Sequence, residues 1–352
     1  MEKIKVAVIF GGKSSEHDVS CVSAKTVINA LDKDKYDITC IGITKQGHWL
    51  LVDPSEDISL MKWENGTTKA VISPDSDHKL IITDGSSFEE REVDVAFPVL
   101  HGLWGEDGTI QGLFEMAAIP YVGCGHLASA VTMDKFFTKI IVDDIGVDQA
   151  DYVGVRAYEL RDMDKVVERI EAKRQYPVFI KPSCAGSSVG ISKAHNREEL
   201  ISGLKLAAEN DSKILVEETI VGREIECAVY GHGDDVIASG VGEILAAAEF
   251  YDFDAKYNNS DSKTIIDPEL PEGKADEIRE ASMKIFKACD GFGLARVDFF
   301  LENGTNRVVF NEINAIPGHT SISMYPMLME NAGYKMNDYL DGLIQMAYGR
   351  HQ

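Results

Sequence analysis

Short apolar segments separated by glycines and polar turns fill the first part of the chain. Apolar runs predict buried β-strands at 5–10, 36–44 and 93–100. Apolar positions at helical spacing predict helices at 20–31 and 112–118. The segment 53–93 is more polar and carries turn signals, which predict an inserted hairpin region rather than a domain. Strands that alternate with helices indicate an open α/β sheet, in which ligands bind beyond the carboxyl ends of the strands.

The rest of the chain mixes strand and helix signals in two further units. The unit that begins near Ser129 has predicted helices at 133–145 and 160–173 and predicted strands at 178–181 and 213–217. The unit that begins near Thr219 has predicted strands at 224–230 and 236–244, a polar loop at 250–265, a helix at 274–289, a hairpin at 296–314 and a closing helix at 333–348. A chain of 352 residues is long enough for two or three domains. We expect them at 1–123, 124–218 and 219–352.

The hairpin at 296–314 carries polar side chains at alternate positions of both strands. Arg296 and Asp298 share one face of the first strand, and Glu312 and Asn314 share one face of the second. Asp298, Glu312 and Asn314 supply the oxygen ligands that hard divalent cations prefer, with positions left for water and phosphate oxygens. The pattern predicts a Mg²⁺ site, although it also fits an amphipathic hairpin with a solvated face.

The turn of this hairpin decides which side chains meet. A two-residue loop at Asn303-Gly304 would leave Asp298 and Glu312 on opposite faces. An odd-length loop centred on Gly304 places Asp298 opposite Phe310, and the polar side chains then share one face. We therefore expect an odd-length loop, or a compensating β-bulge.

The amino-acid composition argues against some classes of binding partner. The net charge of −23 argues against nucleic acid and anionic membranes, because both favour clustered Lys and Arg. No apolar run reaches the length of a membrane helix, and residues 1–10 indicate a buried strand rather than a signal peptide. The six cysteines are scattered without CxxC pairs, which indicates neither a disulfide framework nor a zinc site. We expect a cytoplasmic protein.

A glycine-rich segment follows one predicted strand. Lys181 ends the strand, and 183–190 reads Ser-Cys-Ala-Gly-Ser-Ser-Val-Gly. Small residues let backbone N–H groups approach an anion, and Lys181 can meet a phosphate as a point charge. This is not a Walker A loop, because no Gly-Lys-Ser/Thr opens a helix and 191–193 continues as strand. A hairpin folded over phosphates fits better, although the segment also fits a surface loop whose small residues mark turns.

Other polar residues stand where predicted strands end. Glu16 follows a glycine turn and suits either the first turn of a helix or the binding of an ammonium group. His101 follows the strand at 93–100 and suits either a ligand or a structural hydrogen bond. The carboxylates that suit either adenosine groups or a solvated sheet edge are Glu217, Glu218 and Glu224.

Together these segments resemble the D-alanine–D-alanine ligase family of the ATP-grasp superfamily over nearly the whole chain. The motifs that carry the resemblance are Gly-Gly…Ser-Glu at 11–16, Leu-His-Gly…Gly-Glu-Asp-Gly at 100–108, Met-Asp-Lys at 133–135, Lys-Pro…Gly-Ser-Ser-Val-Gly at 181–190, Ala-Lys-Tyr at 255–257, Arg-Val-Asp at 296–298 and Asn-Glu-Ile-Asn…Pro-Gly-His-Thr-Ser at 311–321. The resemblance implies an α/β ATP-grasp fold. A Rossmann-like N-terminal domain would bind the first D-alanine, and two α+β domains would clamp ATP beneath a mobile loop at 250–265.

The resemblance also implies roles for individual residues. ATP contacts outside the adenosine pocket are implied for Lys135, Lys181, Ser188 and Lys256. The adenosine pocket is implied to contain Glu217, Glu218, Ile220 and Glu224. Two Mg²⁺ or Mn²⁺ ions are implied at Asp298, Glu312 and Asn314. A hydrogen-bonded triad that closes the loop is implied for Glu16, Ser187 and Tyr257. Oxyanion stabilisation is implied for Arg296 and the Gly318 amide. Contacts to substrate carboxylates are implied for His101, Ser323 and the Met324 amide.

The implied reaction turns the first D-alanine into an acyl phosphate, which the amine of the second D-alanine attacks. An acyl phosphate hydrolyses in water, so a closing loop is chemically required. The resemblance further implies a homodimer and K⁺ as an activator. The chain departs from the usual family pattern at Cys184, Phe253, His319 and Ile322.

Three rival interpretations remain to be weighed. One is a ligase that joins D-alanine to D-serine or D-lactate; in that class position 324 tends to be arginine, whereas Met324 here favours D-alanine as second substrate. Another is an ATP-binding protein without activity on the same fold. The third, a dehydrogenase, fails because no GxGxxG follows the first strand.

Overall fold

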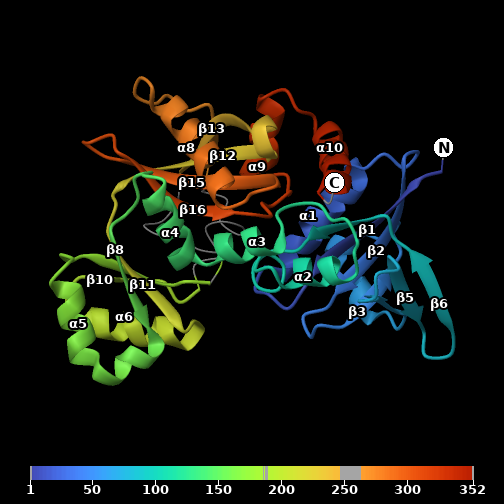
Figure 1. Ribbon diagram of the computed structural model, residues 1–352, viewed down its shortest axis with the longest axis horizontal. Coiled ribbons are helices and arrows are strands. Elements are labelled where there is room, and N and C mark those ends of the chain that lie inside the picture. The colour runs from blue at the N-terminus through green and yellow to red at the C-terminus, as the bar shows by residue number, and fades with distance from the viewer. Residues whose placement is uncertain (1, 185, 187–188, 246–262, 351–352) are drawn as a thin grey trace.

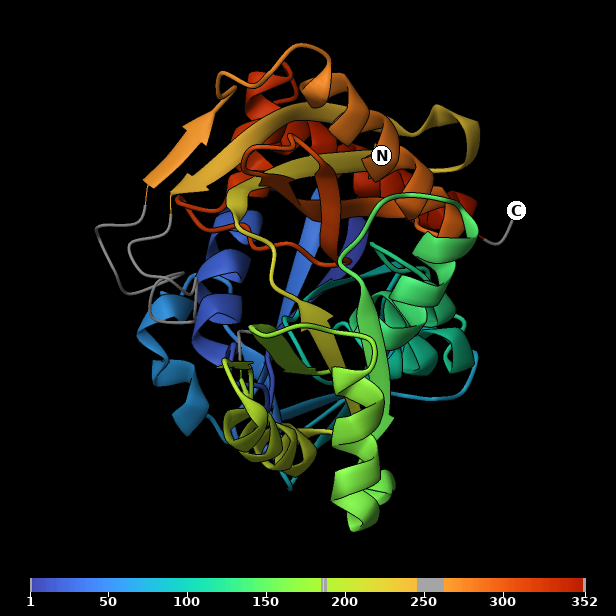
Figure 2. The ribbon, with the colours of Figure 1, turned by 90° about the vertical axis from the view of Figure 1, so that its left-hand side faces the viewer.

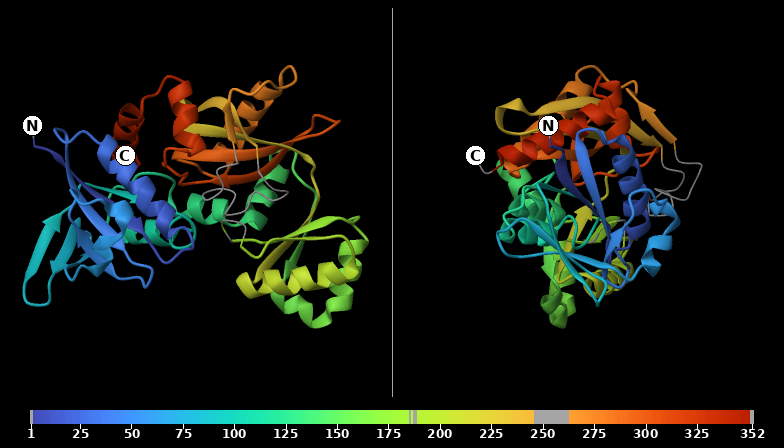
Figure 3. Two further views of the ribbon diagram at one scale, coloured as in Figure 1. Left: turned by 180° about the vertical axis from the view of Figure 1, so that it is seen from behind. Right: turned by 90° about the vertical axis from the view of Figure 1, so that its right-hand side faces the viewer.

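The structure is a computed structural model that describes residues 2–184, 186, 189–245 and 263–350. The chain forms three sheets, and each sheet with its helices is called a body here. The N-terminal body lies at one end of the molecule, and the central and C-terminal bodies lie at the other (Figure 1). The central sheet lies below the C-terminal sheet, as the views from the two sides also show (Figures 2 and 3). These bodies agree with a mixed α/β fold of the ATP-grasp type.

The N-terminal body is built on a sheet in the order β6-β5-β4-β3-β2-β1-β7. Its strands are β1 (Ile4–Gly11), β2 (Tyr36–Ile43), β3 (Trp49–Val52), β4 (Lys69–Ile72), β5 (Lys79–Thr83), β6 (Phe88–Glu92) and β7 (Val95–Val99). Its helical segments are α1 (His17–Ala30), η1 (Ile58–Leu60), η2 (Lys62–Asn65) and α2 (Thr109–Met116). β1 is parallel to β2 and β7, and its apolar run is buried on both faces. The predicted hairpin region at 53–93 is confirmed, and its strands extend the same sheet.

The central body has an antiparallel sheet in the order β10-β9-β11-β8. Its elements are β8 (Tyr152–Arg156), η3 (Ala157–Asp162), α5 (Met163–Glu171), β9 (Val178–Pro182), β10 (Ser192–Ala194), α6 (Arg197–Asn210) and β11 (Lys213–Glu218). The strand that follows the glycine-rich segment is confirmed as β10. Our sequence interpretation missed α6, although Leu200, Leu204 and Ala207 bury at helical spacing and Asn196 caps the helix.

The C-terminal body has a sheet in the order β14-β13-β12-β15-β16. Its elements are β12 (Gly222–Gly231), η4 (Gly233–Asp235), β13 (Ile237–Leu245), β14 (Lys263–Ile266), α8 (Lys274–Ala288), β15 (Gly293–Glu302), β16 (Val308–Asn314), α9 (Met324–Asn331) and α10 (Met336–Gly349). The polar loop predicted at 250–265 ends earlier than expected, because 263–265 belong to β14; residues 246–262 lie outside the described part of the chain. The closing helix is confirmed as α10, and α9 was missed.

The helix predicted at 133–145 is confirmed as α4 (Lys135–Asp144), although it begins two residues later than predicted. A further helix just before it, α3 (His126–Met133), was missed. Asp134 separates them with an extended backbone, and its carboxylate accepts from the N–H groups of Phe136 and Phe137 at 3.2 and 3.4 Å. The correction matters because Lys135 becomes the first residue of α4 and lies at the site described below.

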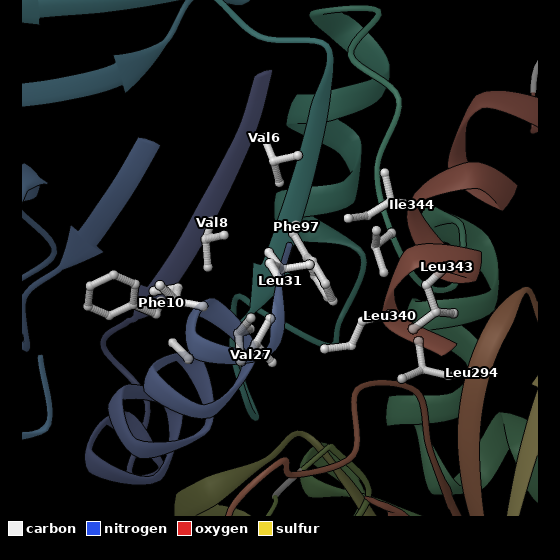
Figure 4. Close-up of a cluster of buried hydrophobic side chains, with 14 of the residues drawn as sticks. Val6, Val8, Phe10, Val27, Leu31, Phe97, Leu294, Leu340, Leu343 and Ile344 are labelled. Atoms are coloured by element: carbon white, nitrogen blue, oxygen red, sulfur yellow. The ribbon is translucent and has the colours of Figure 1, made fainter. Parts of the chain in front are cut away.

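One apolar cluster joins the two ends of the chain. In Figure 4 the side chains of β1 face those of α10 across α1 and β7. The labelled members are Val6, Val8, Phe10, Val27, Leu31, Phe97, Leu294, Leu340, Leu343 and Ile344. The C-terminal helix therefore packs on the N-terminal body, and the segment between β16 and α9 is held between two packed cores. None of the described helices is long and apolar enough to span a bilayer.

Candidate active site

The polar face of the C-terminal hairpin is present, with a register that differs from the predicted one. Near the turn Phe299 pairs with Phe310, and beyond a register shift Asp298 pairs with Glu312. The N–H of Glu302 donates to the carbonyl of Arg307, so the loop 303–306 has even length. The odd-length loop and the pairing of Asp298 with Phe310 were therefore wrong. The alternative of a compensating bulge is confirmed: the extra residue lies at position 311 and returns the carboxylates to one face.

Arg296 lies between two carboxylates on this face. Its Nε and Nη2 donate to the two carboxylate oxygens of Asp298 at 2.8 and 2.7 Å, and Nε lies 3.0 Å from Glu226 Oε2. The amide of Asn314 donates to Asp298 at 3.0 Å. Burial opposes the charge on Arg296, yet Asp298 and Glu226 together raise its pKa well above the ordinary value. Glu226 was missed, although it lies opposite Asp298 on β12.

The predicted lysines meet carboxylates. Lys135 Nζ lies 3.2 Å from Glu312 Oε2, and Lys181 Nζ lies 2.8 Å from Glu217 Oε2. Burial works against the charge of Lys135, but Glu312 raises its pKa above the ordinary value. Lys181 also donates to the side chain of Asn311, the bulge residue, at 3.3 Å. The bulge residue therefore contacts a lysine of the site directly. The alternation of side chains along a regular strand does not predict this contact.

Lys139 is a buried cation that the sequence interpretation missed. Its Nζ lies 3.1 Å from Glu217 Oε1, so Lys139 and Lys181 hold the two oxygens of one carboxylate. Burial would raise the pKa of Glu217, but the two lysines lower it to about 2. The signal was available, because Lys139 stands one helical turn after Lys135 and shares its face of α4.

The other predicted adenosine residues continue from β11 into β12. Glu218 accepts from Arg307 Nη2 at 3.0 Å and from the Asp151 N–H at 3.2 Å. Ile220 and Glu224 are half-buried. The chain passes from the central sheet to the C-terminal sheet between β11 and β12, in the yellow part of Figure 2.

A cavity of about 100 Å³ lies where the N-terminal body meets the hairpin face. The predicted residues that line it are Glu16, His101, Lys135, Arg296, Glu312, Asn314, Gly318, Ser323 and Met324. It brings together residues from β15, β16, α4 and the N-terminal loops, far apart in the sequence. Cations and carboxylates converge there, as expected of a site that handles charged substrates and phosphate.

Glu16 faces this cavity instead of capping its helix. It stands at the N-cap position of α1 but makes no side-chain cap. A Cβ at Gly102 would lie 2.6 Å from Glu16 Oε2, and one at Gly186 would lie 2.9 Å from it. Glycines from two different bodies therefore let their backbones approach this carboxylate closely.

Glu106 also lines the cavity, and it is a second acidic residue that the sequence interpretation missed. Glu106 accepts from the N–H groups of Gly102 at 2.8 Å and Ile316 at 3.0 Å. Burial and the charge of Glu16 raise the pKa of Glu106 to about 8. His101 is also buried, and burial lowers its pKa to about 4, so its ring is neutral at pH 7. Glu106 stands in the motif at 100–108, but no role was predicted for it.

The far wall is formed by the start of α9. The Thr320 N–H donates to Ser323 Oγ at 3.0 Å. Met324 is 2% exposed, and a Cβ at Gly242 would lie only 2.3 Å from its Sδ. Its side chain therefore packs against β13 while the residue lines the cavity.

Comparison with known proteins identifies the family. The family model "D-ala D-ala ligase N-terminus" matches residues 5–124, and "D-ala D-ala ligase C-terminus" matches residues 141–345. The chain belongs to the D-alanine–D-alanine ligase family. It is thus an ATP-dependent ligase by family, and the resemblance inferred from the motifs is confirmed.

Relatives and solved structures match over nearly the full chain. The D-alanine–D-alanine ligase of Acetivibrio thermocellus is 49% identical and the alignment covers 99% of this chain and 97% of that protein. The corresponding ligase of Ruminiclostridium cellulolyticum is 48% identical, covering 100% and 97%. The structure of the VanG D-Ala:D-Ser ligase from Enterococcus faecalis superposes with a TM-score of 0.88 at 37% identity, covering 98% of this chain and 100% of that one. The D-alanine–D-alanine ligase from Coxiella burnetii superposes with a TM-score of 0.84 at 34% identity, covering 99% and 96%.

The residues that are expected to bind metal ions supply oxygen ligands, which suit a hard cation. Asp298 and Glu312 are opposite each other in the ladder, and Asn314 contacts Asp298. Two carboxylates and an amide oxygen fit Mg²⁺. Within 2–184, 186, 189–245 and 263–350, no group of three or more His, Cys, Asp or Glu side chains is arranged for a metal. The predicted residues Ser187, Ser188, Lys256 and Tyr257 lie outside the described part of the chain.

Proposed function

We propose that this protein condenses two D-alanines into a dipeptide at the expense of ATP. The observation that carries the proposal is the cavity in which Lys135, Arg296 and Glu312 converge within a chain of the D-alanine–D-alanine ligase family. Such a set can neutralise a moving phosphoryl group at one end and an acyl oxyanion at the other.

In the first step the carboxylate of one D-alanine attacks the γ-phosphate of ATP and becomes D-alanyl phosphate. We assign Glu16 to the ammonium group of this D-alanine and place His101 beside its carboxylate. Lys135 and Lys181 bind phosphates, together with Ser188 and Lys256, and the adenosine pocket contains Glu217, Glu218, Ile220 and Glu224. Asp298, Glu312 and Asn314 would hold two Mg²⁺ or Mn²⁺ ions, which supply charge neutralisation for the transferred phosphoryl group.

In the second step the amine of the other D-alanine attacks the acyl carbon, and phosphate leaves. Arg296 and the Gly318 amide stabilise the oxyanion of the tetrahedral intermediate. Ser323 and the Met324 amide receive the carboxylate of the second D-alanine. Ser187 and Tyr257 join Glu16 in closing the loop, which keeps water from the acyl phosphate.

We also propose the wider setting of the enzyme. The chain divides into domains at 1–123, 124–218 and 219–352, with the loop 250–262 closing the site. The enzyme is a cytoplasmic homodimer, activated by K⁺, with no nucleic-acid or membrane partner, and its dipeptide serves peptidoglycan synthesis.

The test is product stoichiometry. Purified protein with ATP, Mg²⁺ and D-alanine should release dipeptide, ADP and phosphate in equal amounts. The proposal fails if no dipeptide forms over a range of pH and ion conditions while ATP still binds, because that result describes an ATP-binding protein without ligase activity.

The likeness to the VanG D-Ala:D-Ser ligase makes D-serine a specific rival for the second substrate. The apolar Met324, packed against β13, offers no charged donor to a serine hydroxyl. An unpaired buried hydroxyl costs roughly 1–3 kcal/mol, which favours D-alanine about ten- to a hundred-fold. Equimolar D-alanine and D-serine in competition, with D-lactate in a parallel reaction, should therefore give mainly D-alanyl-D-alanine by mass. Predominant D-alanyl-D-serine would overturn the substrate assignment.

A further inference from the structure

The segment 316–319, between β16 and α9, is tied to the N-terminal body by buried hydrogen bonds. The carbonyl of Ile316 accepts from His101 Nδ1 at 3.0 Å. The N–H of the same residue donates to Glu106 Oε1 at 3.0 Å. Both backbone polar groups of Ile316 are thus held by side chains that stand more than two hundred positions earlier in the chain.

A second tie holds the other end of the segment. Ser23 Oγ, on α1, accepts from the N–H of His319 at 3.1 Å and lies 3.2 Å from His101 Nε2. One proton arrangement satisfies every contact: neutral His101 donates from Nδ1 to Ile316, and Ser23 donates to Nε2. Ser23, His101 and His319 are all buried. Both nitrogens of His101 therefore hold protein groups, so its proposed place beside the first D-alanine carboxylate is a packing contact and not a hydrogen bond.

Glu106 connects this network to the loop that carries His101. Its other oxygen, Oε2, accepts from the Gly102 N–H at 2.8 Å. One carboxyl group thus joins two backbone N–H groups from opposite sides of the cavity. Such a bridge fixes the distance between the N-terminal loop and the segment 316–319.

Gly318 lies between Ile316 and His319, the two residues whose backbone groups these hydrogen bonds hold. A Cβ at this position would lie 2.9 Å from Ser323 Oγ, so the backbone runs close to the start of α9. The N–H of Gly318 is the oxyanion donor in the function proposed above. A donor of this kind works only when it is aimed at the position the oxyanion will occupy, and a displacement of about 1 Å can cost about a hundred-fold in rate.

We propose that Glu106, acting with His101 and Ser23, is a positioning residue that aims the Gly318 amide at the tetrahedral intermediate. It holds the backbone that carries the donor and does not itself touch the reacting atoms. The inference rests on the proposed function, and it makes the second step depend on Glu106 more than the first. Phosphoryl transfer uses Lys135 and Lys181, which pair with Glu312 and Glu217.

The test compares dipeptide with phosphate in Glu106→Gln. The glutamine keeps the shape and accepts one N–H, but its amide nitrogen opposes the other. D-alanyl phosphate should still form, and without a well-aimed oxyanion donor water hydrolyses it to D-alanine and phosphate. We expect dipeptide kcat to fall about tenfold or more, dipeptide per phosphate to fall well below one, and the KM for ATP to change by less than about twofold.

Asp107→Asn is the matched control in the same loop. The Asp107 carboxylate accepts from the N–H groups of Trp104 and Thr109, which lie within three positions of it in the same loop, and not in the segment 316–319. This variant should keep one dipeptide per phosphate even if its thermal stability falls. Ser23→Ala, which removes the tie at His319, should lower the ratio in the same direction as Glu106→Gln.

The outcomes separate the two proposals. If the unchanged protein makes no dipeptide, the proposed function fails. If it makes dipeptide and Glu106→Gln keeps both the ratio and kcat, the positioning role is refuted. If Glu106→Gln loses both products equally, or if neither Glu106→Gln nor Ser23→Ala folds, the network is only a stability element and the inference is wrong.

Discussion

The variant Lys139→Met tests the buried charges between α4 and β11. Lys139 is 2% exposed and Glu217 is 4% exposed. Lys139 Nζ lies 3.1 Å from Glu217 Oε1 and donates to the carbonyl of Ala150 at 3.1 Å. Lys181 holds the other oxygen of Glu217 at 2.8 Å. The methionine fills a similar volume but leaves half of the carboxylate without its cation.

The expected loss of stability follows from leaving a buried carboxylate without one of its two cations. Removing one partner of a buried ion pair costs about 3–5 kcal/mol, and the remaining Lys181 places this case at the lower end. Burial opposes the charge of Glu217, and the two lysines together lower its pKa to about 2, which shows that both stabilise the ionised carboxylate. We therefore expect Lys139→Met to lower the free energy of unfolding by about 3 kcal/mol.

Urea unfolding at pH 7, followed by circular dichroism, measures this loss. The matched control is Lys205→Met on α6, where the side chain is exposed and the change should stay within about 0.5 kcal/mol. The double variant Lys139→Met with Glu217→Gln should regain part of the loss, because the glutamine carries no charge and its carbonyl oxygen can still accept from Lys181. A loss below about 1 kcal/mol for Lys139→Met would refute the reasoning.

Three further predictions concern packing, pH and capping. Gly242→Ala should lower the free energy of unfolding by about 1–3 kcal/mol, because the new Cβ would meet Met324 Sδ at 2.3 Å; Gly112→Ala, which meets nothing within 4 Å in α2, should not destabilise, and equal losses in urea would contradict the packing argument. Burial raises the pKa of Glu106 from 4.5 to about 8, so its contribution is complete below pH 4.5 and is lost as the pH rises to 8. The stability of the unchanged protein relative to Glu106→Gln should fall across that window by up to about 1.4 kcal/mol per pH unit, and a flat difference would exclude the raised pKa. Asn196→Ala should cost about 1 kcal/mol in thermal unfolding, because its side chain accepts from an N–H of the first turn of α6 at 3.0 Å; an unchanged midpoint would show that the cap is not needed.

Local patterns in the sequence predicted most of the N-terminal body and the hairpin strands. The apolar run of β1 and the alternation of polar and apolar residues on β15 and β16 are properties of short segments. Such local patterns can be recognised without knowing the tertiary structure. α3 was missed and the start of α4 was predicted two residues too early, because Asp134 both ends α3 and caps α4. α6 was missed although its N-cap residue and its apolar spacing are present in the sequence, so this helix could have been predicted.

The sequence by itself determined which chemical groups are available and which of them share a face of a strand. Arg296, Asp298, Glu312 and Asn314 were identified in this way, since side-chain direction alternates in any strand. Only the tertiary structure decided how those faces meet. The bulge at Asn311, the pairing of Lys139 with Glu217 and the bridge from Glu106 to Ile316 join segments that are distant in the chain. Their geometry depends on the packing of three separate sheets, and no periodicity within one segment carries that information.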